Sequence, residues 1–118
     1  MMKKEIQLKS EDFGSEYAGK YVFETLAWGA LNQITSDSTK LDPVSRKGSV
    51  DIKQLNAKIL DATMTVRPPT ITFDTLISSE GIPAPLGEFL MTIADEVNGG
   101  SKEEQERLKK LKQRCGLT

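Results

Sequence analysis

The chain of 118 residues contains no histidine and a single cysteine. Without an imidazole, it has no Ser-His or Cys-His nucleophile pair and no zinc site built from clustered Cys and His. One cysteine cannot close an intramolecular disulfide, so the fold does not depend on one and a reducing compartment suits it. Acid–base chemistry is left to carboxylates, lysine and tyrosine, and we expect a protein that is not an enzyme and binds no cofactor or metal.

Long apolar runs and an excess of either charge are also absent. The longest stretch without a charged residue, Thr25 to Ser36, has 12 residues, whereas a membrane-spanning helix needs ~18 or more apolar residues. A net charge of −1 argues against binding nucleic acid by phosphate neutralisation. No apolar segment follows the lysines near residue 1, so a secretory signal is not expected. The length predicts a single small domain over residues 1–118. Taken together, the composition predicts that this domain is soluble and intracellular.

The first half of the chain predicts one brief strand and one helix. Polar and apolar residues alternate from Glu5 to Lys9, which indicates an edge strand or a frayed arm. A helix is predicted from Tyr17 to Ile34. Glycine destabilises a helix interior relative to alanine, so we expect Gly29 to be there because another segment packs close to the helix. The apolar stripe of this helix has the spacing of one helical face: Phe23, Leu26, Ala27, Ala30, Leu31 and Ile34.

Residues 36–49 are polar and contain Pro43 and Gly48, which predicts a long loop that is functional or mobile. Ser49 or Asp51 can cap the helix that follows, which runs to about Thr63. Residues 64–66 either extend this helix or leave it as a strand, and Pro68 and Pro69 exclude any further helix.

Two further helices have clear local signals. Residues 70–73 are either extended or, with Thr72 as a cap, begin a short helix. Pro83 and Pro85 suit the first turn of a helix that ends at Asn98-Gly99-Gly100, a left-handed stop. Its apolar residues follow the helical period: Leu86, Phe89, Leu90, Ile93, Ala94 and Val97.

The last helix, residues 101–115, is predicted from a capping box of Ser101 and Glu104. Acidic residues crowd its first turns and basic residues its last, which matches the helix dipole. Only Leu108, Leu111 and Cys115 are apolar, so we expect it to be loosely attached. Together these segments predict a mainly α fold, a small single-domain bundle of four to five helices with at most a short N-terminal strand or hairpin.

Two groups of residues invite a catalytic or ligand-binding interpretation. Glu88 and Asp95 lie seven residues apart, hence on one helical face, but nothing implies a pocket around them, and a solvated face explains them better. Gly99-Gly100-Ser101-Lys102 precedes a helix, yet a phosphate-binding loop requires a preceding strand and the order Gly-Lys-Ser/Thr. A turn followed by a helix cap explains that segment better, and no catalytic or metal-binding residues are assigned.

Candidate protein-binding residues are of two kinds. Trp28, near Tyr17, Tyr21 and Phe23, belongs either to the core or to a recognition platform. The basic end of the last helix either is solvated or binds an acidic partner. The candidate partner-binding residues are Trp28, Leu108, Leu111, Arg107 and Lys110.

The order of these segments resembles a known family. An aromatic-rich segment ends in Trp28-Gly29-Ala30-Leu31-Asn32, and after a polar loop comes a helix of the type Val50-Asp51-Ile52-Lys53-Gln54-Leu55-Asn56-Ala57-Lys58-Ile59-Leu60. A Pro-containing segment leads to Ile82-Pro83-Ala84-Pro85-Leu86-Gly87-Glu88-Phe89-Leu90, Val97-Asn98-Gly99 and a charged Ser-x-x-Glu helix. From about Tyr17 to Leu111 this pattern is similar to the small tail assembly chaperones of long-tailed bacteriophages and related proviruses.

The resemblance implies a protein that binds the phage tape-measure protein, keeps it soluble and assists assembly with the tail tube protein. It implies a location in the host cytoplasm and absence from the mature virion, with no nucleic acid or membrane as partner, and it leaves the oligomeric state open. The alternative is a structural head–tail connector or neck component, which predicts stable rings that are present in the particle. For a protein with this role, we predict that removing everything after Gly100 leaves a folded protein that no longer solubilises its client.

Overall fold

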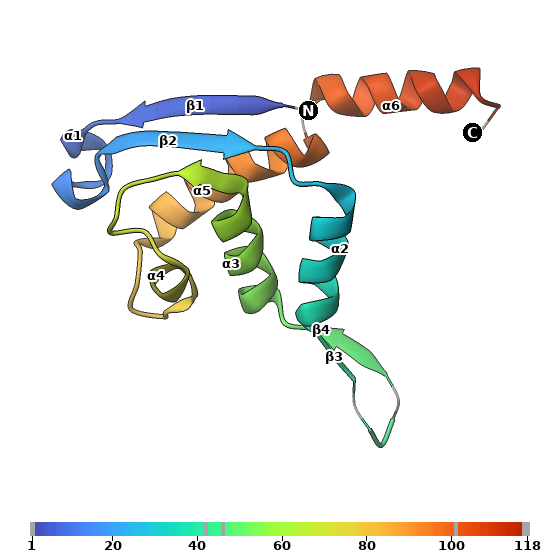
Figure 1. Cartoon of the computed structure of the whole chain (residues 1–118), viewed down its shortest axis with the longest axis horizontal. Helices are drawn as coiled ribbons and strands as arrows, with labels where there is room; N and C mark the ends of the chain where they lie inside the picture. The colour runs from blue at the N-terminus through green and yellow to red at the C-terminus, as the bar shows by residue number, and fades with distance from the viewer. Residues whose placement is uncertain (1, 42, 46, 101, 117–118) are drawn as a thin grey trace.

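The computed structural model describes residues 2–41, 43–45, 47–100 and 102–116. It contains a three-stranded antiparallel sheet and a separate two-stranded sheet in addition to helices (Figure 1). The composition is 57% helix and 18% strand. The predicted mainly α bundle of four to five helices is therefore wrong, and the chain has a mixed α/β fold.

The larger sheet is made of β1 (Lys3–Leu8), β2 (Gly19–Glu24) and β5 (Met64–Val66), with β2 in the centre. The alternating residues of β1 form an edge strand. Of the two alternatives predicted for this segment, the edge strand is therefore confirmed and the frayed arm is not. A short helix α1 (Ser10–Phe13) and a 3₁₀ turn η1 (Ser15–Tyr17) connect β1 to β2. The register places Ile6 opposite Tyr21 and Lys4 opposite Phe23, so these residues share one face of the sheet.

The helix predicted for Tyr17–Ile34 is wrong in its first half. Tyr21, Val22 and Phe23 are aromatic or β-branched, which suits a strand, and β2 has a hydrogen-bonded strand on each side. Helix α2 begins only at Trp28 and ends at Asp37. A Cβ added at Gly29 would have no atom within 4 Å, so the close neighbour expected there is absent from the described structure.

The predicted loop 36–49 contains regular structure. Its first residues complete α2, and β3 (Thr39–Leu41) pairs with β4 (Gly48–Val50) in an antiparallel hairpin. Figure 1 shows this hairpin projecting from the lower end of α2. Residues 42 and 46 lie outside the described part of the chain.

Three helices predicted for the second half are confirmed with small shifts of their ends, and of the two alternatives for residues 70–73 the structure has the short helix. These helices are α3 (Ile52–Thr63), α4 (Phe73–Ile77), α5 (Ala84–Asp95) and α6 (Lys102–Arg114), with the irregular segment η2 (Glu96–Gly100) between the last two. Asp51 caps α3, because its Oδ1 accepts a hydrogen bond from the Gln54 N–H at 3.1 Å. Thr72 caps α4 in the same way, and residues 64–66 leave α3 as strand β5. The predicted Ser101–Glu104 capping box lies outside the described residues.

The core lies between one face of the larger sheet and helices α3 and α5 (Figure 1). Tyr21 and Phe23 extend from β2 onto α5, where Leu86 and Leu90 are fully buried. At the edge of this layer, Lys4 Nζ lies 3.0 Å from Glu96 Oε2. The buried cluster consists of Leu8, Tyr21, Phe23, Leu60, Met64, Ile71, Leu86, Leu90, Ile93, Ala94 and Val97.

The molecule is wide and thin. Its extents are 50 × 43 × 20 Å and its radius of gyration is 16.6 Å, against about 13–14 Å for a compact domain of this length. The difference comes from two projections, the β3–β4 hairpin and helix α6, which point away from the core (Figure 1). Within the described ranges, no helix is both long and apolar enough to cross a membrane.

Candidate functional site

A network of hydrogen bonds centred on Asn98 lies in η2, just before helix α6. The chain leaves helical geometry at Asn98 (φ −92°) and at Gly99 (φ 105°), which confirms the predicted left-handed stop. The Asn98 side chain accepts from the Leu26 N–H at 2.9 Å and donates to Thr63 Oγ1 at 3.1 Å. It therefore ties the end of α5 to the β2–α2 connection and to the end of α3.

Thr25 adds a second set of hydrogen bonds to the same network. Its Oγ1 donates to the Val97 carbonyl at 2.7 Å and accepts from the Met2 N–H at 2.8 Å. Sequence reasoning missed these roles of Thr25 and Asn98, because their partners are up to 72 residues away along the chain. The η2 segment that precedes α6 is thus fixed to the body from several directions.

Beyond this start, α6 extends away from the body. Its main contact is with η2, and Figure 1 shows the helix projecting past the top of α2. Leu108 and Leu111 retain 46% and 41% of their possible exposure. The helix therefore presents an apolar seam, defined here as Leu108 and Leu111, that the described chain leaves half uncovered.

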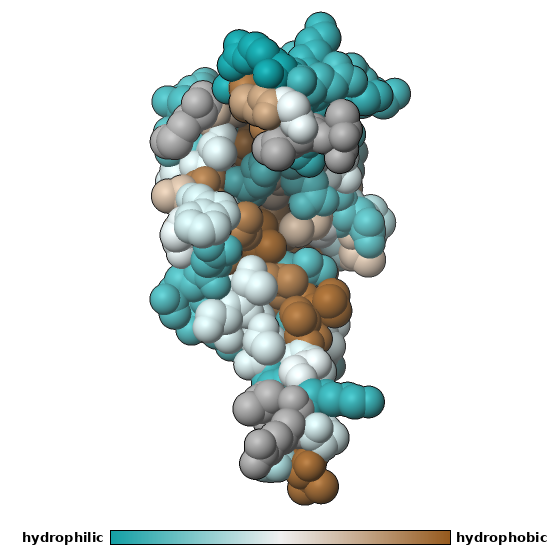
Figure 2. All heavy atoms as spheres, turned by 90° about the vertical axis from the view of Figure 1, so that its right-hand side faces the viewer, coloured by the Kyte–Doolittle hydropathy of each residue, from teal (hydrophilic) through white to brown (hydrophobic). Residues whose placement is uncertain are grey.

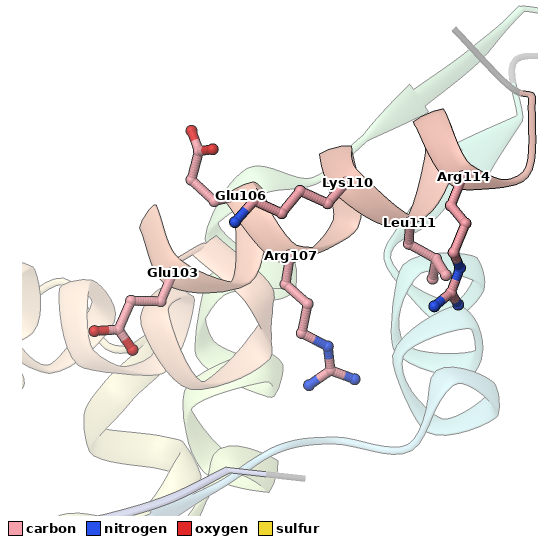
Figure 3. Close-up of a pocket in the computed structure, with 6 residues that line it drawn as sticks. All are labelled: Glu103, Glu106, Arg107, Lys110, Leu111 and Arg114. Carbon is pink, nitrogen blue, oxygen red and sulfur yellow. The ribbon is translucent and has the colours of Figure 1, made fainter.

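Charged side chains border this seam. Five charged residues and Leu111 itself line an open hollow of about 600 Å³ along the helix (Figure 3). All of its lining residues belong to α6 and recur at spacings of three and four, so they share one helical face. In Figure 3, Arg107, Leu111 and Arg114 project from the same side of the helix. The hollow is lined by Glu103, Glu106, Arg107, Lys110, Leu111 and Arg114.

Because this hollow has only one wall, it is an exposed surface and not an enclosed site. A smaller hollow of about 470 Å³ lies at the start of α6, where Arg107 and Leu108 face Thr25 and Asn98. Arg107 lines both hollows. The structure therefore brings together four of the five predicted partner-binding residues: Arg107, Leu108, Lys110 and Leu111.

Trp28, the fifth predicted residue, is separate from these four. It is the first residue of α2, is 80% exposed and lines neither hollow. The core interpretation of Trp28 is wrong, whereas Tyr21 and Phe23 are buried. Figure 2 shows the side of the molecule towards which α6 and the hairpin extend, where separate apolar patches lie between hydrophilic residues.

The carboxylates considered for catalysis do not converge. Glu88 is exposed beside an open groove of about 380 Å³ between α3, α4 and α5. Asp95 is exposed in a different hollow, next to Leu31 and Ile59. In the described part of the chain, no three Cys, Asp or Glu side chains are grouped so that they could hold a metal ion.

Tyr21 has a raised pKa, but its side chain belongs to the buried core. Burial, with a smaller contribution from Tyr17, raises the pKa of its phenol to about 12. The hydroxyl donates to the Tyr17 carbonyl at 2.7 Å. A phenol that is buried, protonated and hydrogen-bonded stabilises the fold and is not available to act on a substrate.

Comparison with known protein families, with curated proteins and with solved structures finds no match for this chain.

Proposed function

We propose that this protein is a tail assembly chaperone of a long-tailed bacteriophage or provirus, which binds the tape-measure protein without catalysis. The observation that carries the proposal is the half-uncovered leucine seam on a helix that projects from the body. A tape-measure protein consists largely of long amphipathic helix, and such a helix packs its apolar stripe against the apolar face of another element. The tail tube protein is a second partner implied by the same role.

The small size of the seam fits a transient partner. Covering two half-exposed leucines contributes on the order of 2 kcal/mol from apolar burial. Such a contact is reversible, as a chaperone requires if it acts in the host cytoplasm and is absent from the finished particle. Three of the residues that carry the resemblance, Val97, Asn98 and Gly99, lie in η2, the segment that connects α5 to α6.

The test is co-expression with the tape-measure protein encoded by the same phage genome. We expect the tape-measure protein to become soluble and to co-purify with the intact chain, and to be lost to the insoluble fraction with the double variant Leu108→Ser/Leu111→Ser. The matched control is Val44→Ser, which removes a 91% exposed apolar side chain from the hairpin and should leave solubilisation unchanged.

Two results would contradict the proposal. One is a tape-measure protein that stays insoluble with the intact chain. The other is recovery of this protein as stable rings in purified phage particles, which would favour the head–tail connector or neck component instead.

A further inference from the structure

In the second half of α6, from Arg107 to Arg114, the charges beside the leucine seam are all positive. Residues 107–114 contain five basic residues and no acidic residue. At about 100° per residue, Arg107 and Arg114 lie on one flank of the seam and Lys112 lies on the other. All three are exposed. By contrast, residues 1–100 carry a net charge of −4 and residues 102–114 a net charge of +3.

This arrangement disfavours a second copy of the chain as the occupant. In an antiparallel pair of α6 helices, Arg107 and Arg114 of one copy would face the same residues of the other. In a parallel pair, Arg107 would face Lys112 of the other copy. Residues that flank an apolar seam decide which helices pair, and both orientations bring like charges together.

A membrane surface or a nucleic acid fits less well. Helices that bind membrane surfaces have a broad apolar face rich in large residues, whereas α6 presents two leucines and residues 102–114 contain no aromatic residue. Binding to nucleic acid depends on neutralising many phosphates. The middle of the basic face of α6 is apolar and the chain as a whole has a net charge of −1, so this requirement is poorly met.

We propose that the seam of α6 binds an amphipathic helix whose apolar stripe is flanked by aspartate or glutamate. The inference rests on the proposed function and names the chemistry of the client segment. The acidic flanks of the client lie against Arg107, Lys112 and Arg114. Glu103, at the other end of the hollow, favours a basic residue at the corresponding end of the client and so sets its direction.

The experiment uses the intact chain and two labelled synthetic helical peptides with the same leucine stripe. One peptide carries glutamate at its flanking positions and the other carries lysine. Fluorescence anisotropy measures binding, with phosphatidylserine vesicles and a DNA duplex as further probes. We expect the glutamate peptide to bind at least tenfold more tightly than the lysine peptide, and more weakly as salt is raised.

Two variants locate the binding to α6. Leu108→Ser/Leu111→Ser should abolish binding, and Arg107→Gln/Lys112→Gln/Arg114→Gln should remove the preference between the peptides while keeping the helix, because glutamine has a helix propensity close to that of arginine and lysine. Circular dichroism checks that each variant keeps its helix. Lys47→Gln and Lys53→Gln, two exposed basic residues outside α6, are the matched controls and should bind as the intact chain does.

Equal binding of both peptides, or binding of vesicles or DNA alone, would overturn the inference, as would a concentration-dependent dimer that the leucine variant abolishes. The proposed function fails separately. Rescue of the tape-measure protein without any peptide preference would contradict only the inference, whereas a clear peptide preference without rescue would contradict only the function.

Discussion

Asn98 joins three segments through two side-chain hydrogen bonds. Replacing it with alanine leaves the Leu26 N–H and the Thr63 hydroxyl without these partners in a partly buried place. We expect Asn98→Ala to lower the free energy of unfolding by about 2 kcal/mol, measured by urea denaturation. The control is Asn32→Ala on the exposed side of α2, with an expected change within about 0.5 kcal/mol. Equal effects of the two substitutions would contradict the bridging role of Asn98.

Tyr21 makes stability depend on alkaline pH. Its pKa is about 12 in the folded chain and about 10 in the unfolded chain. Between these values the unfolded state loses the proton while the folded state keeps it, so the stabilisation is complete below pH 10 and is lost as the pH rises to 12. We expect a loss on the order of 2 kcal/mol across this window.

Thermal unfolding from pH 9 to pH 12 measures this loss, and the variant Tyr21→Phe separates it from the titration of lysines. The variant is expected to be less stable at pH 9, because the Tyr17 carbonyl loses its donor, but to fall less steeply above pH 10. Parallel pH profiles for the two proteins would show that the Tyr21 phenol titrates alike in both states.

Among the elements, those with local signals could be predicted from the sequence. Helices α3, α5 and α6 have caps or stops and apolar residues at helical spacing within one short segment. The segment that became β2 has a helical spacing as well, and its strand geometry follows from pairing with β1 and with β5, more than 40 residues later. Period alone could not reveal that pairing.

The hairpin was missed for a related reason. Its strands are three residues each and are mostly polar or small, so they show no alternation. They pair because α2 and α3, which pack against each other, hold the two ends of the connection together. A further link is the Asp51 N–H, which donates to the Ser38 carbonyl at 2.8 Å.

The candidate site likewise has one part that could be predicted from the sequence and one part that could not. The seam and its charges could be predicted, since one amphipathic helix contains Arg107, Leu108, Lys110 and Leu111. Trp28 could not be placed, because its burial depended on whether residues 19–24 formed a helix or a strand. The support beneath α6 also depends on contacts between residues distant in sequence, such as Asn98 with Thr63.

At the scale of the whole molecule, α6 is separable from the core. The side chains of α6 that the structure describes are absent from the buried cluster between the sheet and α5, and the hydrogen bonds of Asn98 and Thr25 lie before its first residue. Removing the chain after Gly100 therefore deletes six of the 16 basic residues and the leucine seam, while the described core contacts remain.

We expect this truncated chain to keep its secondary structure apart from α6, with a melting temperature within about 5 °C of the intact chain, since 1 kcal/mol corresponds to roughly 4–8 °C in a domain of this size. It should no longer solubilise a tape-measure client. Circular dichroism with thermal melting, together with the co-expression assay, measures both effects. Unfolding of the truncated chain would place α6 in the core, because loss of a binding surface alone leaves the contacts of Tyr21, Phe23 and Leu90 intact. Retained solubilisation by a folded truncated chain would place the client site on the body and not on α6.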